Sequence, residues 1–106
     1  MQERMLITVV FDEHSDLWNT DKHENMAVVE AAAKLLEGII SGRGYLLYPE
    51  LFVALGYNID GRDWYEIFKR LGWAYKPKED EVLELRCLME DDDRAGIEVV
   101  VKKEEE

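Results

Sequence analysis

The strongest constraint on the fold is an alternating pattern near the C-terminus. Apolar and polar residues alternate in "VLELRCLM" and again in "GIEVVVK", and the polar stretch "EDDDRA" separates the two runs. Period-two alternation is typical of strands with one buried face, and a short polar connection joins such strands into an antiparallel hairpin. The pattern predicts an inner face with Leu85, Cys87, Ile97 and Val99, in which Cys87 is a buried thiol.

The N-terminal segment predicts a further strand from Arg4 to Phe11. It contains "MLITVVF", which is rich in β-branched residues and apolar at both alternate sets of positions. We therefore expect both faces of this strand to be covered. A three-stranded antiparallel sheet is the most economical use of the strands.

A long helix is predicted from Asp21 to Ser41. The run "NMAVVEAAAKLLEGII" places apolar residues at helical spacing, and "SGRG" ends it. Asp21 or Thr20 can cap its first turn, and Glu30 and Lys34 lie one turn apart on the side away from the apolar stripe. The predicted buried stripe consists of Val29, Ala32, Leu36 and Ile39, widened by Val28, Leu35 and Ile40.

Two shorter helices are predicted in the middle of the chain. Pro49 suits the first position of a helix that reaches Leu55, and Gly56 lies just beyond it. The next helix, 61–71, begins after Asp60 as a predicted cap and ends at Gly72. Its predicted buried positions are Trp64, Ile67, Phe68 and Leu71.

These elements predict one small α+β domain over residues 1–106, in the order β-α-α-α-β-β, with a frayed acidic tail at 103–106. The arrangement resembles a winged helix, in which a helix pair is followed by a β-hairpin wing. The usual winged helix places its first strand after the first helix, whereas this strand precedes it. The chain has one cysteine and no apolar run of membrane-spanning length, which favours a cytoplasmic protein without membrane association.

Charge is divided unevenly along the chain, whose formal net charge is −11. Residues 1–40 carry three basic and eight acidic side chains, residues 41–78 carry six and four, and residues 79–106 carry four and twelve. Two acidic segments therefore flank a mildly basic middle. Such a surface disfavours nucleic acid and favours a partner protein with a basic surface.

The sequence thus predicts a non-enzymatic acidic module that regulates or inhibits another protein. One form of this hypothesis is a nucleic-acid mimic that occupies a basic groove; a homodimer stays open as well. Trp18 either folds back onto the sheet or projects as an interface anchor, and the tyrosines near the helix pair could form a patch. The predicted partner-binding residues are Glu90, Asp91, Asp92 and Asp93 at the hairpin tip, together with Trp18 and Tyr57.

DNA binding by a winged-helix regulator is the first alternative. It would use Arg62, Lys69 and Arg70 on helix 61–71. Against it, Glu66 can pair with Arg70, and four carboxylates at the wing tip would oppose a phosphate backbone.

A metal-dependent hydrolase is the second alternative, because the loop at 12–24 holds both histidines beside several carboxylates. His14, Asp16 and His23 could ligate Zn²⁺, Mn²⁺ or Fe²⁺ with an open position for water. Their spacing matches no metal signature, and a solvated loop is the simpler interpretation. The chain shows no glycine-rich phosphate loop or nucleophile elbow, so no cofactor is predicted.

Overall fold

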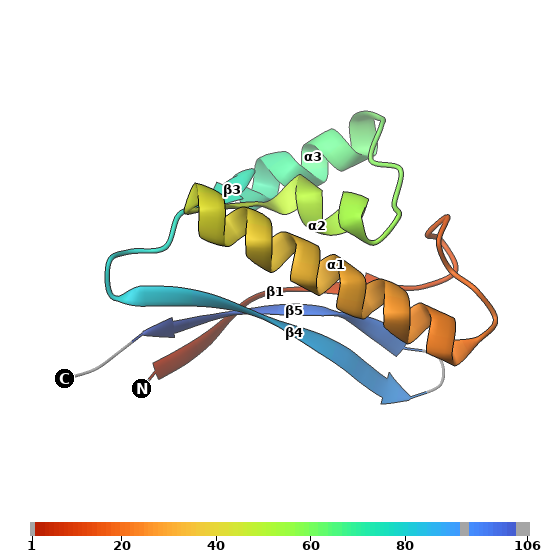
Figure 1. Cartoon of the computed structure of the whole chain (residues 1–106). Helices are drawn as coiled ribbons and strands as arrows, with labels where there is room; N and C mark the ends of the chain where they lie inside the picture. The colour runs from red at the N-terminus through yellow and green to blue at the C-terminus, as the bar shows by residue number, and fades with distance from the viewer. Residues whose placement is uncertain (1, 92–93, 104–106) are drawn as a thin grey trace.

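The computed structural model describes residues 2–91 and 94–103, with side chains described outside 89–94. Along the chain the elements are β1, α1, β2, α2, α3, β3, β4 and β5 (Figure 1). Three helices lie on one side of a three-stranded antiparallel sheet, which confirms the predicted α+β class. Two strands of two residues each, β2 (Leu46–Leu47) and β3 (Ala74–Tyr75), form a second small sheet that was not predicted.

The sheet has the last strand of the chain at its centre. Strands β1 (Gln2–Phe11) and β4 (Glu81–Asp91) both pair antiparallel with β5 (Arg94–Lys103), which gives the order β1-β5-β4. Ile97 and Val99 of β5 are fully buried, as predicted, because this strand has neighbours on both edges. Of the predicted frayed tail, Lys103 belongs to β5, and 104–106 lie outside the described residues.

Strand β1 is covered on one face only, so the prediction for its two faces is wrong. Val9 and Phe11 are buried on the helix side, whereas Val10 on the open side is 49% exposed. A β-bulge between Met5 and Ile7 interrupts the pairing with β5, and both Leu6 and Ile7 pack against the core. Because a bulge shifts the alternation by one residue, the strand is apolar at both alternate sets without being covered twice.

Cys87 is exposed, so the prediction of a buried thiol on β4 is wrong. Its neighbour on the same face, Leu85, is buried beneath the helix layer. Because β4 is an edge strand, its helix-facing side chains have a neighbouring strand on one side only, and Cys87 is therefore left open.

Helix α1 (Lys22–Arg43) packs directly on the sheet, over β4 and β5. The Asp21 carboxylate accepts the N–H of His23 at 2.8 Å, so the predicted cap is confirmed. Leu35 was expected to be buried but is 59% exposed, because the sheet and α2 cover the helix only partway around its circumference. The buried residues of α1 are Asn25, Val29, Ala32, Ala33, Leu36 and Ile40.

Helices α2 (Tyr48–Ala54) and α3 (Arg62–Leu71) form an outer layer above α1 (Figure 1). The predicted cap of α3 is wrong: Gly61, with φ 121°, occupies the N-cap position, and no side chain caps the helix. The Asp60 N–H instead donates to the side-chain oxygen of Asn58 at 3.0 Å.

Helix α3 is less buried than its apolar pattern predicts. Phe68 is its one buried residue, whereas Ile67 and Leu71 are each 37% exposed. The reason is that α3 lies beyond α2 and packs against it through aromatic rings, with Phe52 of α2 lying 5.1 Å from Trp64 and 5.5 Å from Phe68 between ring centroids. Within the described ranges, no helix is both long and apolar enough to span a bilayer.

Candidate functional site

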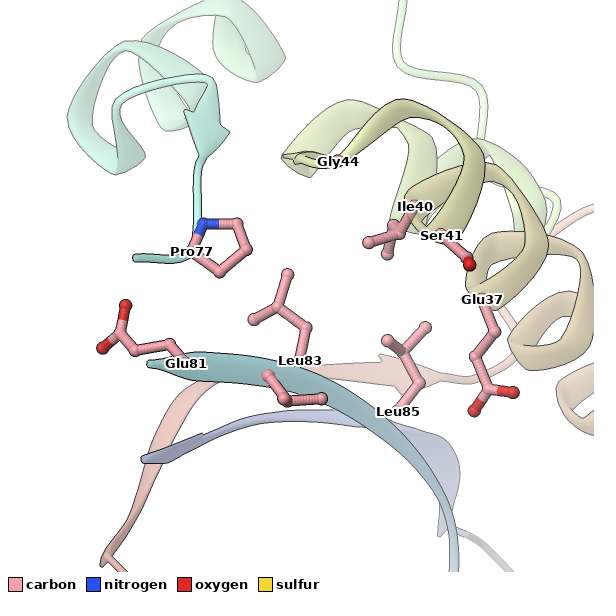
Figure 2. A pocket seen from close by; sticks show the side chains of 9 residues that line it. Glu37, Ile40, Ser41, Gly44, Pro77, Glu81, Leu83 and Leu85 are labelled. Atoms are coloured by element: carbon pink, nitrogen blue, oxygen red, sulfur yellow. The ribbon is translucent and has the colours of Figure 1, made fainter. Parts of the chain in front are cut away.

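A groove of about 400 Å³ lies between the C-terminal half of α1 and the start of β4 (Figure 2). Leu83 and Leu85 of β4 form an apolar floor, Ile40 of α1 lies across the groove from them, and Pro77 from the β3–β4 connection closes one side. The remaining lining residues are Glu37, Ser41, Gly44, Glu81 and Val82. An apolar trough with carboxylates near its ends matches the aliphatic stem and charged head of lysine or arginine. We call it the α1–β4 groove.

The carboxylate of Glu81 is already engaged within the protein. It accepts the Lys78 N–H at 2.9 Å and the Tyr75 hydroxyl at 3.0 Å, and Arg4 Nη2 lies 3.6 Å from its second oxygen. These donors, with the Lys78 N–H foremost, hold the pKa of Glu81 below its usual range. Its side chain is only 7% exposed, so Glu81 fixes the shape of the groove.

Glu37 stands at the other end of the groove and is exposed. Glu30 lies two helical turns before it, on the same side of α1. Across the described part of the chain, neither carboxylate forms an ion pair or a hydrogen bond with a side chain, and the expected pair between Glu30 and Lys34 is not formed. We call Glu30 and Glu37 the acidic stripe.

The charges of the acidic stripe affect the thiol of Cys87 on β4. Partial burial, and then the charges of Glu30 and Glu37, raise the pKa of Cys87. Cys87 lies two residues after the buried Leu85 on β4, so both side chains are on the face of the sheet that α1 covers. Glu37 lines the groove itself, whereas Glu30 and Cys87 are not among its lining residues.

The acidic stripe was not predicted from the sequence. The seven-residue spacing of Glu30 and Glu37 does place them on one side of a helix. What could not be read from the spacing is that this side runs beside the outer edge of β4.

A second, shallower hollow of about 550 Å³ lies between the loop after β1 and the α2–α3 layer. Its lining residues are Val10, Asp12, His14, Asp16, Phe52, Tyr57, Asn58 and Trp64. The Tyr57 hydroxyl donates to the Val10 carbonyl at 2.7 Å and accepts the Asp12 N–H at 3.1 Å. Burial raises the pKa of Tyr57 to about 12. Tyr57, predicted to meet a partner, therefore has its hydroxyl engaged inside the protein.

Asp12 and His14 form a close pair in this hollow. One Asp12 carboxylate oxygen accepts the His14 N–H at 2.9 Å and lies 3.0 Å from His14 Nδ1. Burial acts to raise the pKa of Asp12, but the hydrogen bonds from His14 and Tyr57 outweigh it and lower that pKa.

The proposed metal-ligand set is not assembled. His23 lies in the first turn of α1, where its N–H is bound to Asp21, and Asp16 is exposed with its N–H bound to the Gly56 carbonyl at 3.2 Å. Within residues 2–91 and 94–103, no three His, Cys, Asp or Glu side chains form a group that could hold a metal ion.

The basic residues proposed to read DNA are all exposed. Arg62 begins α3, and Lys69 and Arg70 lie in its last turn. The predicted ion pair between Glu66 and Arg70 is not among the ion pairs of the described side chains. The charges of Arg62, Lys69 and Arg70 are therefore open to solvent, whereas Arg70 was expected to pair with Glu66.

The remaining predicted partner-binding residues are those of the hairpin tip and Trp18. Glu90 and Asp91 belong to β4, but their side chains, and Asp92 and Asp93 entirely, lie outside what the structure describes. Trp18 folds back onto the protein and packs edge-to-face on Phe11, with ring centroids 5.3 Å apart.

No protein-family model, no curated protein and no solved structure matches this chain.

Proposed function

We propose that this protein binds another protein by holding a basic segment of it in the α1–β4 groove, next to the acidic stripe. The observation that carries the proposal is an apolar floor beside two carboxylates on one side of α1, neither of which has an ion-pair partner among the described side chains. A lysine or arginine can lay its methylene stem on Leu83 and Leu85 and direct its cationic head to Glu37.

The rest of the charge distribution supports this choice of partner. A net charge of −11 steers cationic partners toward the molecule and raises association rates at low salt. Each exposed ion pair contributes only about 0.2–1 kcal/mol, so affinity must come mainly from the apolar floor. The carboxylates then favour positively charged partner segments over negatively charged ones.

The experiment uses a defined peptide of alternating lysine and valine, seven residues long and blocked at both ends. Binding to the full chain is measured by NMR chemical-shift titration at low salt. The double variant Glu30→Gln with Glu37→Gln is expected to weaken binding roughly fivefold, because two exposed ion pairs are lost.

The matched control is Glu13→Gln with Glu66→Gln, two exposed acids elsewhere that change the net charge by the same amount. It is expected to leave the affinity within about twofold at moderate salt, where distant charges are screened. Equal weakening by the two double variants would contradict a local site and leave only a diffuse effect of net charge.

In this proposal the protein is a regulator or inhibitor rather than an enzyme, and it acts in the cytoplasm. A more specific version of this proposal is that the protein mimics nucleic acid, so that the partner segment belongs to a nucleic-acid-binding surface. That form also depends on the tip carboxylates at 90–93, and replacement of Asp91, Asp92 and Asp93 by Asn is its separate test. Slower association with the basic peptide is the result that supports it.

DNA binding through α3, in the manner of a winged helix, is the second candidate function. It is favoured by the exposure of Arg62, Lys69 and Arg70, which form no ion pair with the side chains that the structure describes. We expect no duplex binding tighter than the non-specific range of roughly 10⁻⁴–10⁻⁶ M in a mobility-shift assay at moderate salt. Submicromolar binding that Arg62→Ala or Lys69→Ala weakens would promote the DNA-binding function above the first.

A further inference from the structure

The two outer strands of the sheet differ in how ready their edges are to pair. Strand β1 carries a bulge between Met5 and Ile7, which breaks the regular row of backbone groups. Strand β4 keeps an uninterrupted register with β5 from Glu81 to Met89, and in the described chain it has no strand on its other side. Bulges are a common device that protects an edge from pairing. In this sheet the bulge interrupts the β1 edge, whereas the β4 edge is regular from Glu81 to Met89, and the β4–β5 register shifts only between Met89 and Asp91.

The orientation of the backbone at the open edge follows from Glu81. Its N–H donates to the Lys78 carbonyl at 2.9 Å, outside the sheet. Because successive residues of a strand direct their backbone groups to opposite edges, the N–H and C=O groups of Leu83, Leu85 and Cys87 point away from β5 as well. The side chains of Leu83 and Leu85 line the groove, so the same residues present both the free backbone groups and the floor (Figure 2).

From these features we infer that the partner segment binds as an extended strand that adds to β4 and extends the sheet to four strands, with its lysine or arginine side chains on the α1 side. This inference rests on the proposed function and specifies how the basic segment binds. Residues opposite Leu85 and Cys87 in the added strand place their side chains toward the acidic stripe. The residue opposite Leu83 lies over the groove.

Charge also favours the binding of a basic strand from another protein over the pairing of β4 with a second copy of this chain. A two-fold pairing of β4 with itself would bring α1 and its copy to the same side of the joined sheet, with both acidic stripes next to the new seam. Glu30 and Glu37 would then lie near their own equivalents, and each copy carries a net charge of −11. Like charges oppose that assembly, whereas a basic strand neutralises the stripe.

The test uses two N-methylated forms of the lysine–valine peptide. In the inferred pairing, lysines with side chains on the α1 side also direct their N–H groups to β4, and valines direct theirs outward. Methylation of the backbone nitrogens of the lysines, which leaves their side-chain ammonium groups unchanged, is expected to weaken binding at least tenfold, because several backbone hydrogen bonds are lost. Methylation of the valine backbone nitrogens, which leaves the charge of the peptide unchanged, is expected to change the affinity less than about threefold.

Two further readouts locate the contact on the protein. Amide hydrogen exchange at Leu83, Leu85 and Cys87 is expected to slow when the unmethylated peptide binds, while exchange in β1 is unchanged. Alkylation of Cys87 by iodoacetamide is expected to slow as well, because the added strand covers the thiol.

The possible outcomes separate this inference from the proposed function. If both methylated peptides bind equally well and Glu30→Gln with Glu37→Gln still weakens them, the groove binds a basic segment but strand addition is wrong. If no peptide binds, the proposed function itself is wrong. If sedimentation shows a dimer that protects the same amides without peptide, the occupant is a second copy and the inference is overturned.

Discussion

Two tyrosine hydroxyls attach the outer α2–α3 layer to opposite ends of strand β1, and they do so in different ways. Tyr57 bonds to the backbone of β1's C-terminal end, at the Val10 carbonyl and the Asp12 N–H. Tyr75 accepts a hydrogen bond from the Arg4 side chain at 2.8 Å and donates to Glu81 at 3.0 Å. The Tyr57 hydroxyl also lies 3.0 Å from an Asp12 carboxylate oxygen. The Tyr57 attachment therefore combines two peptide groups with one carboxylate, whereas the Tyr75 attachment depends on charged side chains alone.

The difference has a physical consequence for when each attachment fails. Peptide groups do not titrate, so the hydrogen bonds between Tyr57 and the backbone persist in acid and are lost when Tyr57 itself ionises. The Tyr75 attachment depends on a carboxylate and so weakens in acid. Arg4 pairs with Val101 of β5, and Val101 pairs with Leu83 of β4, so the three residues form one row across the sheet.

The largest expected effect comes from glycines next to the two attachments. Gly56 has φ +85°, and a Cβ there would lie 2.5 Å from Leu17 Cγ and 2.7 Å from Ser15 Oγ. Gly72 has φ +93° but no atom within 4 Å of its Cβ position. Gly56→Ala should lower the free energy of unfolding by roughly 2–4 kcal/mol, because overpacking adds to left-handed strain, and Gly72→Ala by about 1–2 kcal/mol. Urea unfolding measures both; equal losses would mean that Ser15 and Leu17 move aside without strain.

Removal of each hydroxyl compares the attachments directly. Tyr57→Phe leaves the Val10 carbonyl and the Asp12 N–H without this partner and should lower the free energy of unfolding by about 1–3 kcal/mol. Tyr75→Phe should lower it less, because Arg4 is largely exposed and Glu81 keeps the Lys78 N–H. Thermal or urea denaturation of both variants provides the measurement. A larger loss in Tyr75→Phe would reverse the order of the two attachments.

Alkaline titration isolates the Tyr57 attachment. Burial raises the pKa of Tyr57 to about 12, above the usual tyrosine value near 10. A raised pKa in the folded state stabilises the fold fully below the unfolded value, and this stabilisation is lost as the pH rises from about 10 through 12. We expect the wild type to lose stability over that interval by more than Tyr57→Phe, as followed by urea unfolding at each pH. Identical slopes would show that Tyr57 does not contribute.

Acid titration followed at Glu81 tests the Tyr75 attachment and gives the smallest effect. The pKa of Glu81 is lowered in the fold, so its contribution is present above the usual glutamate value and is lost as the pH falls through the folded pKa. In Tyr75→Phe the pKa of Glu81 should rise but stay below the usual value, because the Lys78 N–H remains its foremost donor. Carbon-detected NMR of the Glu81 carboxyl measures this. A return to the usual value in that variant would assign the whole shift to Tyr75.

Local features of the fold could be predicted from the sequence, and relative placement could not. Asp21 caps α1 because capping needs only residues two or three positions apart. Leu85 and Cys87 have the same place in an alternating pattern, yet one is buried and the other exposed, since coverage of an edge strand depends on where α1 lies. Two aliphatic residues at the α3 surface, Ile67 and Leu71, differ from the prediction for the same reason.

The candidate site was predictable to a similar extent. Negative charge and a basic partner could be argued from composition alone. Tyr57 was identified as important, but its internal hydrogen bonds depend on contacts more than 40 residues apart. The acidic stripe required both the helical spacing of Glu30 and Glu37 and the position of β4, and only the first is local.

The central position of β5 affects how the chain can fold during its synthesis. Strand β1 leaves the ribosome first, but its register pairs Gln2 with Lys103, at the far end of the described chain. At synthesis rates of about 5–20 residues per second, β1 waits roughly 5–20 s for β5 to emerge. The β4–β5 hairpin can close locally, whereas docking of β1 closes a long loop and is expected to be the slow step. A chain cut short before β5 would leave the apolar residues of β1 exposed, which makes such fragments substrates for chaperones and proteases.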